Sequence, residues 1–216
     1  MNDRQRGLKR FVGGIYSSAA ERFYEPMVVQ GAFRLFGGEL NQRIIELQTA
    51  AVSSVPGKAV LDMPTGTGYF TVELGGAYDG LVVAADIASG MVRESTAAAK
   101  EAGLDNVHCV QADVHRLPFP DGAFPIVFCW NGLQVMPGLD ASVAELARVT
   151  APGGRLLAST LHLPIGAALP SAASRHLPAA LSSRRRMAEV FEAHGLRVIS
   201  MTAERLSTIF DTLKPG

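Results

Sequence analysis

From residue 58 onward, short continuous apolar runs alternate with longer amphipathic segments, and this alternation constrains the fold more than any other feature of the sequence. Continuous apolar runs are typical of strands that are covered on both faces, and amphipathic segments are typical of helices. Strands that alternate with helices predict an α/β fold with a doubly wound, mostly parallel sheet. The expected strands contain residues 59–61, 81–85, 107–110, 126–128, 156–158 and 198–199.

The expected helices follow from apolar residues that recur at helical spacing. Residues 139–150 and residues 187–194 each place their apolar side chains on one face of a helix. We expect Gly153-Gly154 to end the first of these helices and Gly195 to end the second, because glycine after a helix accepts the backbone conformation that stops it.

Residues 1–57 differ from the rest of the chain, since they hold several aromatic residues and no strand pattern. We predict that residues 1–57 are a helical lid and lead-in and that residues 58–216 are the core domain. The last expected helix of the lead-in carries four apolar residues on one face: Leu40, Ile44, Leu47 and Ala51.

Composition excludes some classes of function. Lys+Arg and Asp+Glu are both 20, and this balance disfavours a broad basic face for nucleic acid. No apolar stretch approaches the roughly 18 residues of a membrane span, so we expect none. Cys109 and Cys129 lie in apolar runs, which favours buried thiols in a reducing compartment and hence a cytoplasmic protein. They lack metal-site spacing, so no metal is expected.

A polar residue ends or follows each of five expected strands, namely Asp62, Asp86, Asp113, Asn131 and His162. The carboxyl ends of parallel strands meet at one edge of an α/β sheet, and ligands bind at that edge. Asp and Asn also start turns, which explains any one of these residues taken alone. Five of them in register favour a ligand-binding edge.

The segment Val60–Phe70 runs from a strand through a Gly-rich turn, with Gly66 and Gly68, into a helix whose first N–H groups can bind a ligand. The chain lacks the Gly-x-x-x-x-Gly-Lys-Ser/Thr of a P-loop. A dinucleotide turn has a third glycine where this chain has Thr71, and Asp62 would repel a pyrophosphate. S-adenosylmethionine has no phosphate and carries an ammonium and a sulfonium, so the acid suits it better.

Two further acids fit an adenosyl ligand. Asp86 follows Gly66 by about 20 residues, a spacing at which an acid accepts hydrogen bonds from ribose hydroxyls in both dinucleotide and adenosyl sites. Asp113 follows the third expected strand and is placed to accept a hydrogen bond from an adenine amino group.

Together these segments resemble the class I S-adenosylmethionine-dependent methyltransferases, in the small-molecule branch similar to ubiquinone/menaquinone-biosynthesis methyltransferases. The resemblance runs from about Lys58 to Leu163, and its motifs follow the family order at residues 61–68, 85–91, 111–119, 131–134 and 149–157. It implies a Rossmann-like sheet of seven strands, an N-terminal helical lid, S-adenosyl-L-methionine as cofactor, and methyl transfer to O, N or C of a small organic acceptor.

The resemblance also implies roles for single residues. The cofactor contacts are expected from Asp62, Pro64, Thr65, Gly66, Thr67, Gly68, Asp86, Ile87, Met91, Ala112, Asp113, Val114, Asn131 and Gly132. Ile87 and Met91 are expected to flank the adenine. The candidate catalytic residues are Tyr24, which could close over the methionine part, and His162, which could bind the acceptor or act as a general base. Each residue also has a purely structural interpretation: Tyr24 could be an aromatic that packs a helix, and His162 could be a partly exposed histidine in a loop.

Two positions depart from the family pattern. Pro64 replaces the first glycine of the turn, and Pro125 stands where relatives often carry Asp, so the fourth strand must tolerate a proline at its start.

The sequence leaves open three other functions: a non-catalytic or repurposed S-adenosylmethionine-binding protein, an RNA or protein methyltransferase and, third, an NAD-binding module. The acceptor and the oligomeric state are also open.

Overall fold

The computed structural model of the chain describes residues 30–134, 136–161, 184–204 and 207–216. Their elements follow one another as α3 (Gln30–Val52), β1 (Val60–Asp62), α4 (Tyr69–Ala77), β2 (Val82–Asp86), α5 (Ser89–Glu101), β3 (Val107–Gln111), β4 (Phe124–Cys129), α6 (Leu139–Val149), β5 (Thr150–Leu161), α8 (Arg184–Ala193), β6 (Arg197–Glu204) and β7 (Ser207–Leu213).

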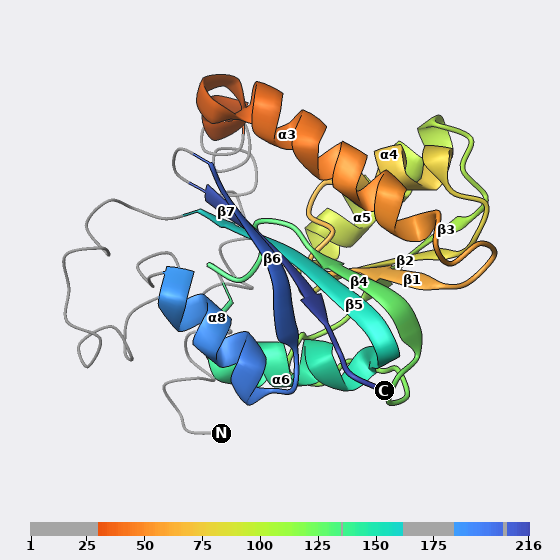
Figure 1. The fold of residues 1–216 in the computed structure, drawn as a ribbon. Helices are drawn as coiled ribbons and strands as arrows, with labels where there is room; N and C mark the ends of the chain where they lie inside the picture. Colours follow the sequence, from red (N-terminus) through yellow and green to blue (C-terminus); the bar gives the residue numbers. More distant parts are fainter. Residues whose placement is uncertain (1–29, 135, 162–183, 205–206) are drawn as a thin grey trace.

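The strands form one sheet of seven in the order β3-β2-β1-β4-β5-β7-β6 (Figure 1). Strands β1 to β5 pair in parallel, whereas β7 runs antiparallel to both β5 and β6. The expected mostly parallel, doubly wound sheet is confirmed. The strand order changes direction between β1 and β4, and this switch point is where open α/β sheets leave a crevice for ligands.

Helices cover both faces of the sheet (Figure 1). Helices α3, α4 and α5 pack on one face, and α6 and α8 pack on the other. The expected helix faces are confirmed, since the inner sides of α6 and α8 are buried, and Gly195 follows α8 with a φ of 76°. The strands between these layers are continuous apolar runs because both of their faces are buried.

The second half of α3 belongs to the core of the domain. Ile44 and Ala51 are buried, and Leu40 and Leu47 pack against them as expected. Buried Gln48 donates from Nε2 to the carbonyl oxygen of Phe70 over 3.0 Å, and its Oε1 accepts from the indole Nε1 of Trp130 over 3.1 Å. One amide therefore connects α3 to the start of α4 and to the end of β4.

Two details of the sheet differ from expectation. Gly153-Gly154 does not end α6, because α6 stops at Val149 and the glycines lie within β5. Gly153 has a φ of 75°, and its N–H bonds to the carbonyl oxygen of Lys214 over 2.8 Å. The two glycines therefore form an irregular first part of β5. Pro125 is the second residue of β4, where the register with β5 shifts, and the missing N–H is tolerated there.

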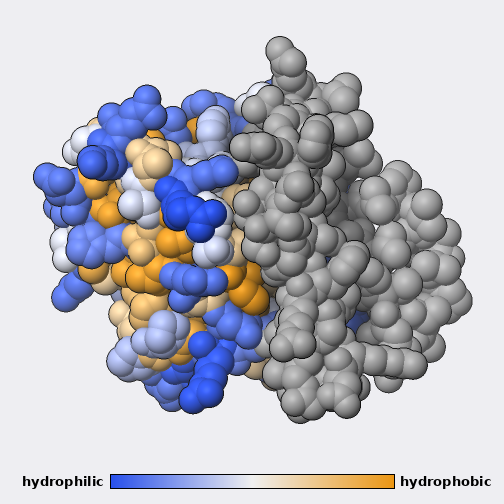
Figure 2. All heavy atoms as spheres, turned by 180° about the vertical axis from the view of Figure 1, so that it is seen from behind, coloured by the Kyte–Doolittle hydropathy of each residue, from blue (hydrophilic) through white to orange (hydrophobic). Residues whose placement is uncertain are grey.

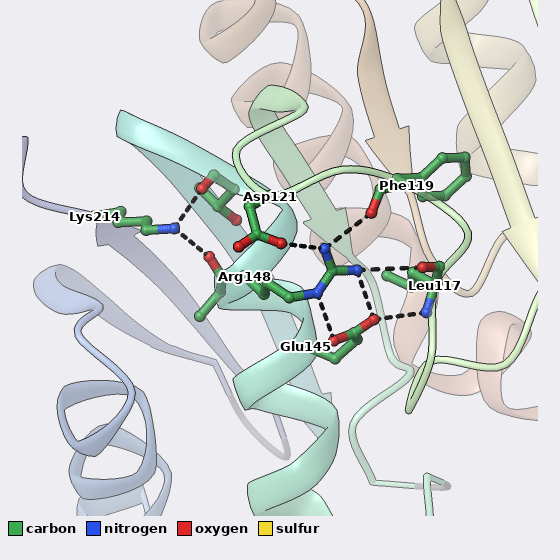
Figure 3. A network of polar contacts seen from close by, with 8 residues as sticks. Leu117, Phe119, Asp121, Glu145, Arg148 and Lys214 are labelled. Atoms are coloured by element: carbon green, nitrogen blue, oxygen red, sulfur yellow. Dashed lines mark hydrogen bonds and ion pairs between the residues drawn. The ribbon is translucent and has the colours of Figure 1, made fainter.

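A polar network fastens the loop between β3 and β4 to α6 (Figure 3). The guanidinium of Arg148 donates to the carbonyl oxygens of Leu117 and Phe119 and to the carboxylates of Asp121 and Glu145. Glu145 in turn accepts the N–H of Leu117 over 2.7 Å. The guanidinium holds the pKa of Glu145 below its usual value, so the carboxylate stays charged at neutral pH.

Seen from behind the view of Figure 1, the described part of the surface shows hydrophilic side chains around a smaller area of apolar side chains (Figure 2). Exposed large apolar side chains in the described part of the chain are Tyr69, Leu81, Ile199 and Met201. Within those same residues, no helix is both long and apolar enough to cross a membrane.

Cys109 and Cys129 are free thiols, with Cys129 buried and Cys109 half-buried. The expected compartment stays a prediction.

Replacing Arg148 by methionine should lower the free energy of unfolding by about 1–3 kcal/mol, because several hydrogen bonds of the loop anchor are lost and Glu145 keeps an unpaired charge. Urea denaturation of both proteins measures the change. The matched control is Arg185→Met, since the Arg185 side chain is 89% exposed, and it should shift stability by less than about 0.5 kcal/mol. Equal losses in the two variants would contradict a special role for the anchor.

Candidate functional site

Four of the polar residues expected at the ligand edge lie at the carboxyl edge of the sheet. Asp62 is the last residue of β1 and Asp86 the last of β2, while Asp113 and Asn131 each follow their strand, β3 and β4, by two residues. The strands pair in register, with Asp62 opposite Ala84. The four side chains therefore come from adjacent strands around the switch point.

The Gly-rich turn from Asp62 to Gly68 is fixed by backbone hydrogen bonds to both neighbouring strands. Met63 donates its N–H to Phe128 of β4, and Thr65 donates to Ala85 of β2, each over 2.9 Å. Gly68 has a φ of 89°, and a Cβ there would lie 2.9 Å from the Cα of Ser95. A side chain at this position would therefore push α4 and α5 apart.

Gly66 faces open space. Its φ is 55°, and a Cβ built on it meets no atom within 4 Å. Its N–H donates to Oδ2 of Asp86 over 3.0 Å. The turn thus leaves room for a ligand next to the carboxylate of the following strand.

Asp86 is oriented by backbone donors, among them the N–H groups of Ala88, Gly66 and Ile87. Its Oδ1 accepts the N–H of Ala88 over 2.9 Å, and its Oδ2 accepts the N–H of Gly66. Asp86 is only 6% exposed, and this burial raises the pKa of its carboxyl despite these hydrogen bonds. A carboxylate oxygen can accept more than one hydrogen bond, so this carboxylate can also accept from two vicinal hydroxyls.

Asp62 is more deeply buried, at 3% exposure. Burial raises the pKa of Asp62 to about 7, the hydroxyl of Thr71 lowers it in part, and the nearby charge of Asp86 raises it further. At neutral pH the carboxyl is therefore divided between its two protonation states. A cationic group beside it would favour the charged form.

Thr71 stands where a dinucleotide turn has its third glycine, and its side chain is fully buried against the turn. Its Oγ1 donates to Oδ2 of Asp62 over 2.5 Å and lies 2.5 Å from Oγ1 of Thr65. Thr65 Oγ1 lies 3.4 Å from Oγ of Ser95. The threonine thus ties the acid to α4 and occupies the place that a glycine would leave open for helix–strand packing.

Several apolar side chains lie near Asp113 on the side of the site next to β3. Ala112, Val114 and Met91 are buried, and Ile87 is half-buried. The N–H of Ala112 bonds to the carbonyl oxygen of Asp86 over 2.9 Å, which brings the segment after β3 next to the end of β2. A flat aromatic ring would have apolar neighbours here and one acid at its rim.

The segment after β4 closes the other side of the turn. Asn131 has a φ of 52° and donates its N–H to Oγ of Ser159 over 2.9 Å, while that hydroxyl donates to Oδ1 of Asn131 over 3.0 Å. A Cβ on Gly132 would lie 2.2 Å from Cδ of Pro64. Pro64, the departure from the family pattern, therefore packs directly on Gly132. The Sγ of buried Cys129 lies close to Gly132, and burial raises the pKa of this thiol.

The structure brings together the fourteen residues expected to contact the cofactor, which lie in or directly after β1, β2, β3 and β4 and at the start of α5. Their contacts with a cofactor stay predictions. Tyr24 and His162, the candidate catalytic residues, lie outside the described residues, as does the expected lid up to residue 29.

Sequence analysis missed several residues that orient the site. Ser159 holds Asn131, and Gln111 Nε2 donates to the carbonyl oxygen of Ile87 over 2.9 Å. Thr71 figured only as a missing glycine, and its bond to Asp62 was not anticipated. Polar residues inside otherwise apolar elements, such as Gln48 and Thr71, are the one signal that could have marked them.

Comparison with known proteins agrees with this geometry. Residues 60–154 match the family model described as a methyltransferase domain. A ubiquinone/menaquinone biosynthesis C-methyltransferase of Shewanella pealeana is 32% identical over 149 residues, which are 68% of this chain and 57% of the relative. A malonyl-[acyl-carrier protein] O-methyltransferase of Halorhodospira halophila is 35% identical over 160 residues, 73% of this chain and 50% of the relative.

The chain spans about half the length of these curated relatives. Among solved structures, the [4+2]-cyclase SpnF is similar with a TM-score of 0.68 and 18% identity, over 80% of each chain, which shows a shared fold. The family model, the relatives and the arrangement of the glycine turn and strand-end acids agree with the sequence motifs. Residues 60–154 therefore match a methyltransferase domain, and the chain resembles the class I S-adenosylmethionine-dependent methyltransferases of ubiquinone/menaquinone biosynthesis.

Proposed function

We propose that this chain binds S-adenosyl-L-methionine at the carboxyl edge of the sheet and transfers its methyl group to O, N or C of a small organic acceptor. The observation that carries the proposal is the pair of buried carboxylates, Asp62 and Asp86, on the two sides of the open turn at Gly66. This arrangement suits a ligand with a cationic amino-acid part and a ribose, and it repels a pyrophosphate.

The residues present fit this cofactor. Asp86 would accept hydrogen bonds from the ribose hydroxyls, Asp62 would attract the ammonium, and Asp113 would accept from the adenine amino group. Ile87 and Met91 would flank the ring. When bound, the cofactor supplies a sulfonium that already activates the methyl group, so the chain needs chiefly to orient the acceptor and exclude water.

The acceptor is proposed from the relatives. One is described as a C-methyltransferase of quinone biosynthesis and another as an O-methyltransferase acting on a malonyl carrier, which favours a small organic acceptor, with a quinone-like metabolite as one candidate class. The roles of Tyr24 and His162 beside it, and the N-terminal lid, remain predictions.

A nucleic-acid acceptor has less support. The arginine run at the start of α8 is the strongest local basic feature of the described residues, yet Arg185 pairs with Glu189 at 2.9 Å and Arg186 with Asp140 at 3.4 Å. The structural similarity to a protein described as a cyclase shows that this fold does not fix the chemistry. A non-catalytic binding protein therefore remains the rival to test.

Isothermal titration should show binding of S-adenosylhomocysteine and S-adenosylmethionine and no binding of NAD, because Asp62 and Thr71 disfavour a pyrophosphate. Tight NAD binding without adenosyl binding would overturn the proposal. Transfer of a labelled methyl group to members of an acceptor panel then separates an enzyme from a binding protein.

Asp86→Ala should weaken S-adenosylhomocysteine binding by a few kcal/mol, since a hydrogen bond to a charged group contributes about 1.5–3 kcal/mol and the carboxylate would make two. The control is Asp105→Ala, which removes an exposed carboxylate from the loop before β3 and should leave the affinity unchanged. Thermal denaturation verifies that both variants fold. Unchanged affinity in a folded Asp86→Ala protein would remove Asp86 from the site.

Affinity should fall as pH drops below about 7, because Asp62 has a pKa of about 7 in the free protein and must lose its proton to attract the ammonium. The expected loss is less than about tenfold per pH unit, and it levels off where Asp62 is fully protonated. The same raised pKa means that the free protein loses stability as pH rises from about 4 to 7, where only the folded state holds the proton.

Titration at several pH values measures this dependence, and Asp62→Asn is the control. The variant should bind more weakly at pH 8 and lose most of the pH dependence. An equal slope in both proteins would assign the titration to another group.

A further inference from the structure

We propose that His115 is a positioning residue that orients Asp113 and thereby makes the site select adenine over hypoxanthine. The inference rests on the proposed function, since it concerns the adenine side of the same site. It comes from the contacts of His115, which connect the segment after β3 to α6.

His115 holds the carboxylate of Asp113 from two directions. Oδ1 of Asp113 accepts the backbone N–H of His115 over 2.9 Å and lies 3.0 Å from its ring Nδ1. An ionised carboxylate can only accept, so Nδ1 carries a proton in this contact. The histidine side chain is 13% exposed and that of Asp113 is 35% exposed, so the bond lies at the inner rim of the site.

The other ring nitrogen of His115, Nε2, contacts α6. This nitrogen lies 3.4 Å from Oγ of Ser142, a fully buried residue in the first turn of that helix, and this hydroxyl also lies 3.3 Å from the carbonyl oxygen of Gly138. The ring thus stands between a helix and the carboxylate. Its rotation is restricted by contacts at both nitrogens.

The same loop is anchored a second time, through Arg148 and Glu145 to Leu117 (Figure 3). The backbone after β3 is therefore held independently of His115. Loss of the imidazole should remove one of the two bonds that orient the Asp113 carboxylate, and so let it turn more easily, while the loop keeps its place.

A fixed carboxylate discriminates between purines by hydrogen-bond polarity. The amino group of adenine donates to it, whereas hypoxanthine carries an oxygen at the same ring position, which can only accept. The carboxylate would face that oxygen as an unpaired acceptor, which costs binding energy. A carboxylate that can turn away loses both the attraction and the penalty. Each carboxylate oxygen accepts more than one hydrogen bond, so the bond from His115 leaves capacity for the ligand.

The test compares the dissociation constants of S-adenosylhomocysteine and S-inosylhomocysteine, its deaminated analogue, by isothermal titration. The wild-type protein should prefer the adenine compound by roughly tenfold or more. His115→Phe keeps a ring without a donor and should reduce this ratio to below about threefold. His115→Asn restores a side-chain N–H near Asp113 and should recover most of the ratio.

The matched control is His108→Phe, the same change at an exposed histidine of β3, and it should keep the wild-type ratio. Thermal denaturation verifies folding, and His115→Ala replaces His115→Phe if the larger ring prevents folding. A general structural defect would weaken both ligands equally and leave their ratio intact.

A wild-type ratio in folded His115→Phe would overturn the inference and leave the proposed function standing. If His115→Asn also loses the preference for S-adenosylhomocysteine, the inference is overturned, because the side-chain N–H of the asparagine would then have no effect. Equal binding of both ligands to the wild-type protein would also overturn it. Failure of the wild-type protein to bind S-adenosylhomocysteine would overturn the proposed function and this inference together.

Discussion

Two carboxylates buried at the ends of β1 and β2 are the constraint on which the site depends. Burying a charge is costly unless hydrogen bonds compensate it. Asp86 obtains them from the N–H groups of Gly66 and Ala88, and Asp62 obtains one from Thr71. The same bonds fix the glycine turn, so the groups that lower the cost of burial also shape the ligand site. Burial raises the pKa of Asp62 despite the hydrogen bond from Thr71, so this bond compensates only part of the cost.

A second set of contacts supports the neighbouring part of the site. The segment after β4 is held by Asn131, Ser159 and the contact between Pro64 and Gly132, and α3 reaches this segment through Gln48 and Trp130. One buried amide therefore supports the start of α4 and the end of β4 together. Methyl transfer from a sulfonium needs orientation more than acid–base groups, so rigid support of this kind would serve the proposed reaction.

Much of the fold and the positions of the strand-end acids could be predicted, because buried parallel strands must be apolar on both faces and because acids at their ends stand out against such runs. Strand β7 could not be predicted from the sequence. Its polar residues Ser207, Thr208 and Thr212 interrupt the apolar run that marks a buried strand, although the sheet buries all three. The roles of Gln48, Thr71 and His115 could not be predicted either, because each depends on a partner that the fold brings from another element.

A crystal structure of the complex with S-adenosylhomocysteine tests the central claim most directly. The account predicts ribose hydroxyls within about 2.5–3.2 Å of the Asp86 carboxylate oxygens, with the ligand's amino group on the Asp62 side of the turn at Gly66. It would be contradicted by a ligand bound away from the carboxyl edge of β1 and β2, with the Asp86 carboxylate still bonded to backbone N–H groups, such as those of Gly66 and Ala88, and to no ligand atom.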